Sequence, residues 1–221
     1  VRDLKAAHEI EPNNPETRGL LCNCYLISGY VSFQRPLIDQ LVAVDPLTPL
    51  TRCMPGFADL MEGNVASALD PYRQMFEMDP GNPMTRLFYV PILAANGRMS
   101  EVREIVSTLP PEVKDTIPAR LTTFVAHALA GNRSDALAML TPEIETIANA
   151  TDVFPRFLAI GYAAIHMADR AIHSLSIAVD RGFINYPFLA HHDPFMKPLR
   201  TDPRFRQLLA TVHDRWEKFD P

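Results

Sequence analysis

The chain has 221 residues, 47% of them hydrophobic and 21% charged, and a formal net charge of −5. This composition is ordinary for a soluble globular protein, and its acidic balance gives no electrostatic reason to expect DNA or RNA as a partner. No apolar run approaches the roughly 18 residues that a membrane-spanning helix needs. The three cysteines, Cys22, Cys24 and Cys53, are odd in number, which favours reduced thiols and a cytoplasmic protein.

An acidic residue followed by proline recurs at one interval in the first eighty residues. The dipeptides Glu11-Pro12, Asp45-Pro46 and Asp79-Pro80 are separated by 34 residues each. Before each dipeptide lies a run whose apolar side chains are three or four apart, and a second such run follows it. The interval therefore predicts a repeat made of a helix, a turn and a second helix.

The predicted helices follow this interval along the chain. We expect them at about 2–11, 15–29, 33–44, 49–62, 64–78, 83–96 and 99–108. Pro55 and Pro91 fall inside two of these helices and should kink them, because a proline removes one hydrogen bond and clashes with the preceding turn. After Pro110-Pro111 the period loosens. Further helices are expected at about 118–130, 134–140, 142–148, 153–166 and 168–181, and Gly182 is expected as a left-handed cap.

The second complete unit resembles the tetratricopeptide repeat family. Gly56, Gly63, Ala68, Tyr72 and Pro80 stand where that family places small, large and helix-ending residues, whereas Gln34 fills a small position in the unit before. The resemblance implies an all-α, right-handed α-solenoid of four and a half to five helix pairs over residues 1–182. The chain starts without Met at an apparent second helix, which predicts a piece of a longer protein.

Residues 183–221 depart from the repeat and form a tail with its own resemblance. The tail contains Tyr186-Pro187, His192-Asp193-Pro194-Phe195 and a last helix with Trp216. It resembles the tail that ends helical-repeat regions of bacterial signalling proteins, in which the repeats follow a Ser/Thr kinase, a nucleotide cyclase or a winged-helix regulator. The apolar stripe of the last helix predicts a cap packed on the last repeat, and partner docking through Trp216 is the alternative.

The sequence predicts neither catalysis nor a cofactor. It has no phosphate-binding glycine loop, no nucleophile elbow and no zinc-protease helix motif. The alternative is a metal or enzymatic site at His191, His192 and Asp193, but adjacent residues of one loop seldom converge on an ion without further ligands.

The resemblance also implies a concave, partner-binding groove lined by the first helix of each pair. Its residues would be Asn23, Leu26, Ile27, Leu50, Cys53, Phe57, Leu60, Met61, Met84, Leu87 and Phe88. These side chains either form an open apolar patch or fill a tight superhelix by touching one another. Only Asn23 matches the clamp that the family uses for acidic carboxyl-terminal peptides, so such a ligand is not expected.

The predicted function is a non-catalytic protein-interaction or scaffold module, the C-terminal regulatory part of a larger bacterial signalling protein. Its partner would be a protein, a peptide or a second copy of the chain. A free-standing adaptor that binds a peptide or helix in the groove is the alternative.

Overall fold

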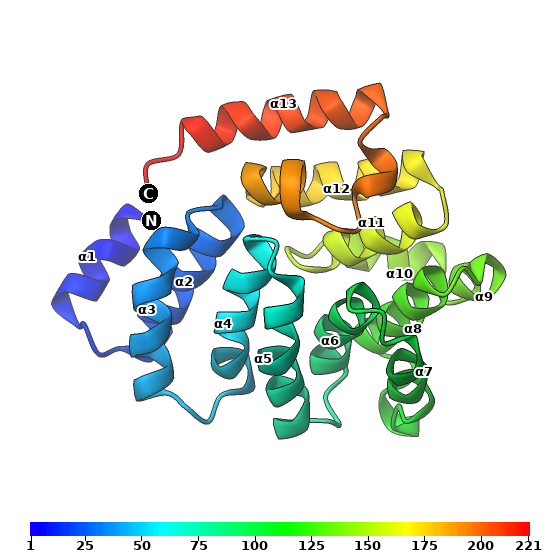
Figure 1. Cartoon of the computed structure of the whole chain (residues 1–221), viewed down its shortest axis with the longest axis horizontal. Helices are drawn as coiled ribbons and strands as arrows, with labels where there is room; N and C mark the ends of the chain where they lie inside the picture. Colours follow the sequence, from blue (N-terminus) through cyan, green and yellow to red (C-terminus); the bar gives the residue numbers. More distant parts are fainter. The chain divides into compact units, whose positions relative to one another are not determined.

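The structure, a computed structural model, describes all 221 residues and contains helices and loops without a β-strand (Figure 1). The chain divides into two compact units. Unit 1 comprises residues 1–78, 182–193 and 209–221, and unit 2 comprises residues 79–181 and 194–208. The expectation of an all-α chain is confirmed.

Unit 1 is built from two helix pairs and a preceding single helix. Its elements are α1 (Arg2–Ile10), α2 (Pro15–Ser28), α3 (Val31–Val44), α4 (Pro49–Met61), α5 (Val65–Met78), η2 (Phe188–His192) and the end of α13 (Pro203–Glu217). Large side chains fill the space within each pair. In the α4–α5 pair the rings of Phe57 and Tyr72 meet edge to face at 5.0 Å, and both side chains are buried.

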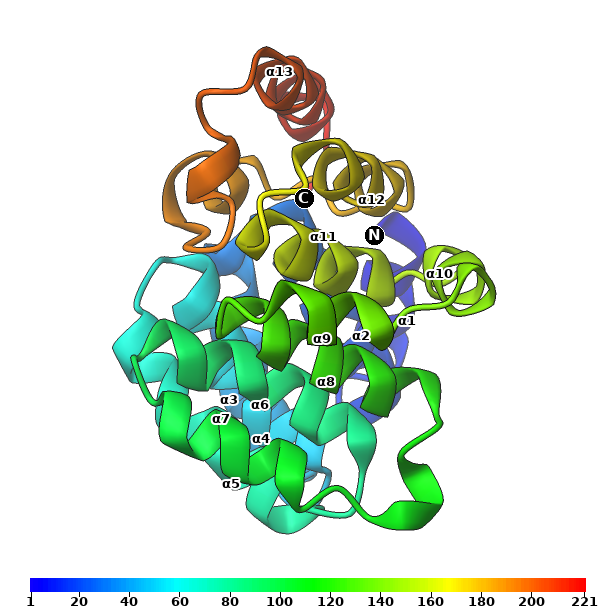
Figure 2. The ribbon, with the colours of Figure 1, turned by 90° about the vertical axis from the view of Figure 1, so that its right-hand side faces the viewer.

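Unit 2 continues the helix pairs. Its elements are α6 (Pro83–Ala95), α7 (Met99–Ser107), η1 (Pro111–Val113), α8 (Ile117–Leu129), α9 (Arg133–Ala138), α10 (Pro142–Asn149), α11 (Phe154–Ala164), α12 (Ala168–Asp180), η3 (Lys197–Leu199) and the start of α13. Helix α8 packs against both α6 and α11 (Figure 2). Phe124 of α8 is fully buried and meets Tyr162 of α11 at 5.3 Å, with Gly161 beside it allowing the close approach.

The first helix of each pair begins at a residue suited to a helix start. Pro15, Pro49 and Pro83 are the first residues of α2, α4 and α6, where proline costs no hydrogen bond and its backbone angle suits a helix. Asn14 and Asn82 precede two of them and cap the helix, with Asn14 Oδ1 accepting from the Thr17 amide at 3.0 Å. The helix starts therefore recur at the same 34-residue interval.

The turn inside each pair repeats the same interval. Gly29, Gly63, Gly97 and Gly131 all have positive φ, between 74° and 84°, which side chains disfavour. The amide that follows each glycine donates to a carbonyl five residues earlier, as in Tyr30 N to Tyr25 O at 2.9 Å. The fifth such turn has His166, at φ 59°, 35 residues after Gly131. The period therefore holds through Gly131, and the expectation that it loosens after Pro110-Pro111 is wrong for this unit.

Two irregularities concern proline. Pro55 and Pro91, expected to kink their helices, lie inside α4 and α6, each of which continues through its proline as one helix. The partner of α8 is split into two helices, in line with the separate ranges expected at 134–140 and 142–148. Helix α9 stops at Ala138, and α10 starts at Pro142 with Thr141 as its cap.

Three of the four arginines that share one repeat position, Arg52 being the fourth, tie the two helices of a pair together. Arg18, Arg86 and Arg120 donate to main-chain carbonyls near the end of the second helix, with Arg18 Nη1 3.0 Å from Gln40 O and Arg120 Nε 3.1 Å from Met139 O. Arg86 is 4% exposed, and burial lowers the pKa of its guanidinium. Because these cations satisfy carbonyls at a helix end, they act as internal caps.

Candidate functional site

The groove positions predicted in unit 1 are mostly filled. Five side chains of α2 and α4 are buried: Leu26, Cys53, Phe57, Leu60 and Met61. Ile27 is half-buried, whereas Asn23 and Leu50 are exposed, Leu50 by 45%. The buried members correspond to the alternative in which groove residues contact one another and leave little area open.

The groove positions predicted in unit 2 show the same trend. Leu87 is fully buried in α6. Met84 and Phe88 are half-buried, and the Phe88 ring meets Phe157 of α11 edge to face at 5.4 Å. A partner role for these eleven residues stays a prediction.

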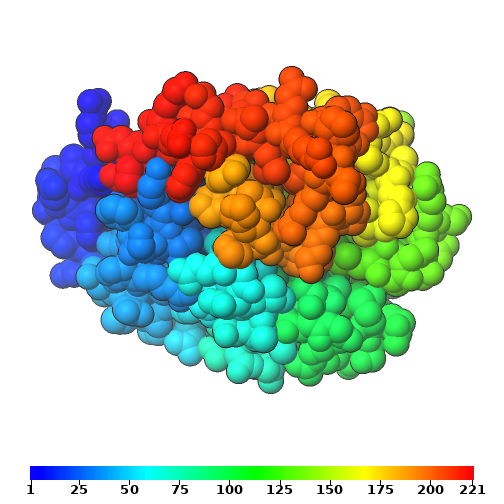
Figure 3. Space-filling view, turned by 45° about the horizontal axis from the view of Figure 1, so that its top comes forward, coloured from blue at the N-terminus to red at the C-terminus, as the bar shows by residue number.

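Residues 182–193 of the tail lie on unit 1, against α2 and α4 (Figure 3). Two carbonyls of the last turn of α2 accept from this segment: Asn185 Nδ2 is 2.9 Å from Leu26 O, and Ile184 N is 2.9 Å from Ile27 O. The Asn185 Oδ1 atom accepts from the Phe188 amide at 3.0 Å. Leu26 O also accepts from the Gly29 amide at 3.3 Å, so the tail adds to the hydrogen bonds that close the end of α2. This contact was not predicted, because no repeat period links the two segments.

The tail approaches unit 1 at two of the repeated glycine turns. A Cβ atom added to Gly29 would lie 2.7 Å from Asn185 Oδ1, and one added to Gly63 would lie 2.7 Å from His192 Nδ1. Both distances are too short for any side chain. The two glycines therefore serve the turn geometry and the close approach of the tail at once.

The end of α13 adds an aromatic cluster to unit 1. The Tyr30 hydroxyl donates to Trp216 O at 2.9 Å, and the two rings stack with centroids 5.8 Å apart. Phe219 stacks on Tyr30 at 5.4 Å, and Tyr186 of the tail contacts His213 at 4.4 Å. Aromatic pairs at such distances add stability beyond the area that they bury.

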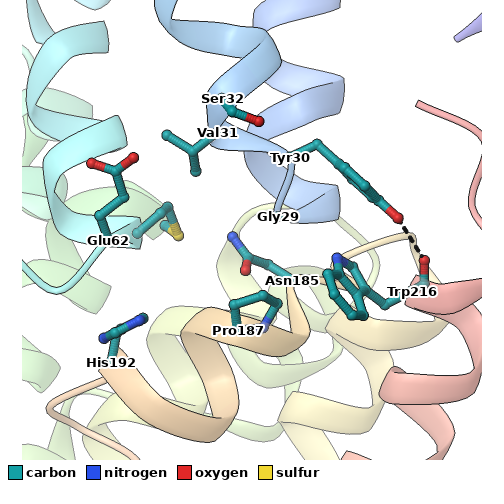
Figure 4. A pocket seen from close by; sticks show the side chains of 10 residues that line it. Gly29, Tyr30, Val31, Ser32, Glu62, Asn185, Pro187, His192 and Trp216 are labelled. Carbon is teal, nitrogen blue, oxygen red and sulfur yellow. Dashed lines mark hydrogen bonds between the residues drawn. The ribbon is translucent and has the colours of Figure 1, made fainter.

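A pocket of about 450 Å³ opens between these segments of unit 1 (Figure 4). It is lined by Gly29, Tyr30, Val31, Ser32, Met61, Glu62, Asn185, Pro187, His192 and Trp216. Of the predicted groove residues it includes only Met61. The remaining lining comes from the α2–α3 turn and the start of α3, Glu62 at the end of α4, the tail and Trp216, which groove positions alone do not identify.

A charged group borders the pocket at Glu62. Arg35 of α3 pairs with Glu62 at 2.5 Å and with Asp59 at 2.6 Å. Desolvation works against the charged guanidinium, yet the hydrogen bonds that Arg35 donates to Glu62 and Asp59 outweigh it and raise the pKa of Arg35. Two carboxylates thus share one cation at this edge.

The alternative metal site is not assembled in the structure. His191 and His192 are exposed, their ring centroids 6.2 Å apart, while Asp193 is fully buried. No three His, Cys, Asp or Glu side chains anywhere in the chain converge to hold a metal ion. The cysteines are free, and burial raises the pKa of the Cys22 thiol to about 12 and that of Cys53 well above its ordinary value.

The comparisons with known proteins bear on the repeat. Residues 59–126, from the end of α4 into α8, match the family model described as tetratricopeptide repeat. Together with the helix pairs within each unit, this match shows an all-α fold with helix pairs of the tetratricopeptide type. No curated protein matches the chain. None of its helices combines the length and the apolar character needed to pass through a bilayer.

Proposed function

We propose that the chain is a non-catalytic module that binds another protein. The observation that carries this proposal is the tetratricopeptide match at residues 59–126, because repeats of this type generally mediate protein interactions and are generally not catalytic. The metal or enzymatic alternative at His191, His192 and Asp193 has less support, since these side chains do not form part of a converging group of ligands.

Exposed apolar side chains support unit 1 as the binding surface. Seven of the nine large hydrophobic side chains that are exposed belong to it: Ile10, Leu20, Phe33, Val44, Leu47, Leu50 and Met78. Ile10, Val44 and Met78 end α1, α3 and α5 at the 34-residue interval. Scattered single residues need no explanation, but a concentration in one unit supports contact with a partner.

The charge of unit 1 indicates what kind of partner fits. Unit 1 has 14 Asp and Glu against 8 Lys and Arg, a formal charge of −6, whereas unit 2 has 12 against 13, a formal charge of +1. Complementary charge speeds association and disfavours wrong partners. The proposed partner of unit 1 is therefore a segment that is both apolar and basic.

Within the predicted groove, the accessible side chains are the ones proposed to touch this partner. These are Asn23 and Leu50, together with the half-buried Ile27. The buried Leu26, Cys53, Phe57, Leu60, Met61 and Leu87 would support the surface from beneath, and Met84 and Phe88 stay candidates in unit 2.

We further propose that the chain is the regulatory region of a larger bacterial signalling protein. The support is the resemblance of residues 183–221 to the tails of such proteins. The alternative is a free-standing adaptor. The coding sequence upstream of Val1 distinguishes the two, because an effector domain in the same reading frame supports the first and a start codon close to Val1 supports the second.

The interaction role is tested by partner capture with matched variants. Leu47→Asp with Leu50→Asp should abolish capture by the chain, since both residues are exposed and their replacement costs no core packing. The control is Ile147→Asp with Val153→Asp, exposed by 43% and 41% in unit 2. Equal capture by both double variants would contradict the proposal, and circular dichroism checks that helicity is unchanged.

A further inference from the structure

Some polar groups of the pocket in unit 1 already have hydrogen-bond partners, and others can still accept a hydrogen bond. The Asn185 amide is occupied on both sides, and the Tyr30 hydroxyl donates to Trp216 O (Figure 4). The Glu62 carboxylate has a partner on one oxygen, Oε2, where Arg35 binds. The strongest acceptor with capacity left in the pocket is therefore the other oxygen of Glu62.

The electrostatics of the pocket favour a positive charge. Glu62 caps the C-terminal end of α4, and C-terminal helix ends carry partial negative charge. The end of α2 contributes less, because Leu26 O and Ile27 O already accept from the tail, and the start of α3 at Val31 is a positive helix end. Asp59 and Glu62 bring two carboxylates against the single guanidinium of Arg35, which leaves one negative charge unmatched.

The walls of the pocket suit an aliphatic stem. Val31 and Met61 are buried and line it together with Pro187 and Trp216. The Tyr30 ring is stacked on both Trp216 and Phe219, so its faces are occupied and do not offer a cation–π site. A long side chain that buries methylene groups along such walls while its charged end reaches a carboxylate is that of lysine or arginine. The volume is in the range of small-ligand pockets.

We propose that this pocket binds the cationic side chain, lysine or arginine, of the protein partner, with Glu62 as its acceptor. The assignment rests on the proposed interaction function only for the source of the cation. It identifies a specific anchor point for the basic partner that the charge of unit 1 favours.

The test uses Trp216, the only tryptophan of the chain, as a fluorescent reporter at the pocket wall. The full chain is titrated at constant ionic strength with Nα-acetyl-arginine amide and with Nα-acetyl-lysine amide. The expected dissociation constant is about 1 mM, which is weak for a ligand. Nα-acetyl-citrulline amide, which has the shape of the arginine probe without its charge, should give no saturable change.

Two variants test the role of the carboxylate. Glu62→Gln should weaken binding of the cationic probes by about tenfold or more, as the loss of a charge-assisted hydrogen bond does. Ser32→Lys places a second positive charge at the exposed rim and should abolish binding. The matched control is Glu77→Gln, an exposed carboxylate of α5 that does not line the pocket and should leave the affinity unchanged.

Several outcomes would overturn the assignment. They are citrulline binding as well as arginine, inorganic phosphate giving the saturable signal in place of the cations, equal effects of Glu62→Gln and Glu77→Gln, or no saturable signal with either cation. Because the probes are single amino acids, their failure leaves the partner-capture test of unit 1 standing. Probe binding together with a failure of that test would retain the pocket and remove the interaction function.

Discussion

Replacing Gly161 by alanine tests how tightly α8 and α11 pack in unit 2. A Cβ atom on Gly161 would lie 2.2 Å from Phe124 Cε1 and 2.5 Å from Cζ, so the phenyl ring has to move. Phe124 is fully buried and held against Tyr162, which blocks an easy shift. Overpacking at such a site costs about 3 kcal/mol, whereas alanine gains about 1 kcal/mol over glycine inside a helix. The expected net loss is about 2 kcal/mol of unfolding free energy.

The assay is urea unfolding followed by circular dichroism, with the Tm as a second measurement. For a chain of this size each kcal/mol corresponds to about 2–4 °C in Tm. The matched control is Gly19→Ala in α2, where the nearest atom, Leu41 Cδ2, lies 4.0 Å from the added Cβ. It should stabilise by up to about 1 kcal/mol.

The packing explanation makes a further demand on the double variant. Phe124→Leu shortens the side chain that meets the added methyl group, so it should destabilise the Gly161→Ala protein less than it destabilises the natural one. If Gly161→Ala were as stable as the natural chain, or if the two changes were additive, the contact between Phe124 and Gly161 would not be the cause.

Three further predictions concern buried polar groups and thiols. Arg86→Leu should lower the free energy of unfolding by about 3 kcal/mol, because buried carbonyls lose their donors, whereas the exposed Arg103→Leu should be nearly neutral in the same urea titration. Asn185→Ala should release the tail from α2, which limited proteolysis would detect as faster cleavage within residues 182–193, and unchanged cleavage would contradict the proposed anchor. A thiol reagent at pH 8 should label the half-buried Cys24 first and the buried Cys22 and Cys53 only on unfolding. Cys22 stays protonated at this pH because burial raises its pKa to about 12. Immediate labelling of all three thiols would refute this prediction.

Much of the fold could be predicted because its signals are local. Proline at the first helical position and glycine in the turn, as at Pro83 and Gly97, mark helix ends through backbone geometry alone. The same reasoning missed the continuity of the period after Pro110-Pro111. His166 takes the left-handed turn position that glycine holds elsewhere, and the split between α9 and α10 disguises the register.

The site was less predictable because it depends on packing between distant segments. The period assigns Phe57 and Leu60 to a helix face, but whether neighbours cover that face is decided by side chains elsewhere in the chain. The contact between Asn185 and Leu26 joins residues 159 positions apart, and neither segment carries a pattern that reports the other. The accessible pocket was therefore found from the structure.

The four equally spaced glycine turns have a consequence for how such a chain can change in length. Since Gly29, Gly63, Gly97 and Gly131 share one backbone geometry, excising or duplicating the stretch between two of them keeps every helix in phase with its neighbours. Gly29 and Gly63 are different in one respect, since they are also fitted to the tail. Insertion or deletion of whole repeats is thus tolerated most readily between Gly97 and Gly131. It is tolerated least between Gly29 and Gly63, because the tail packs against both glycines.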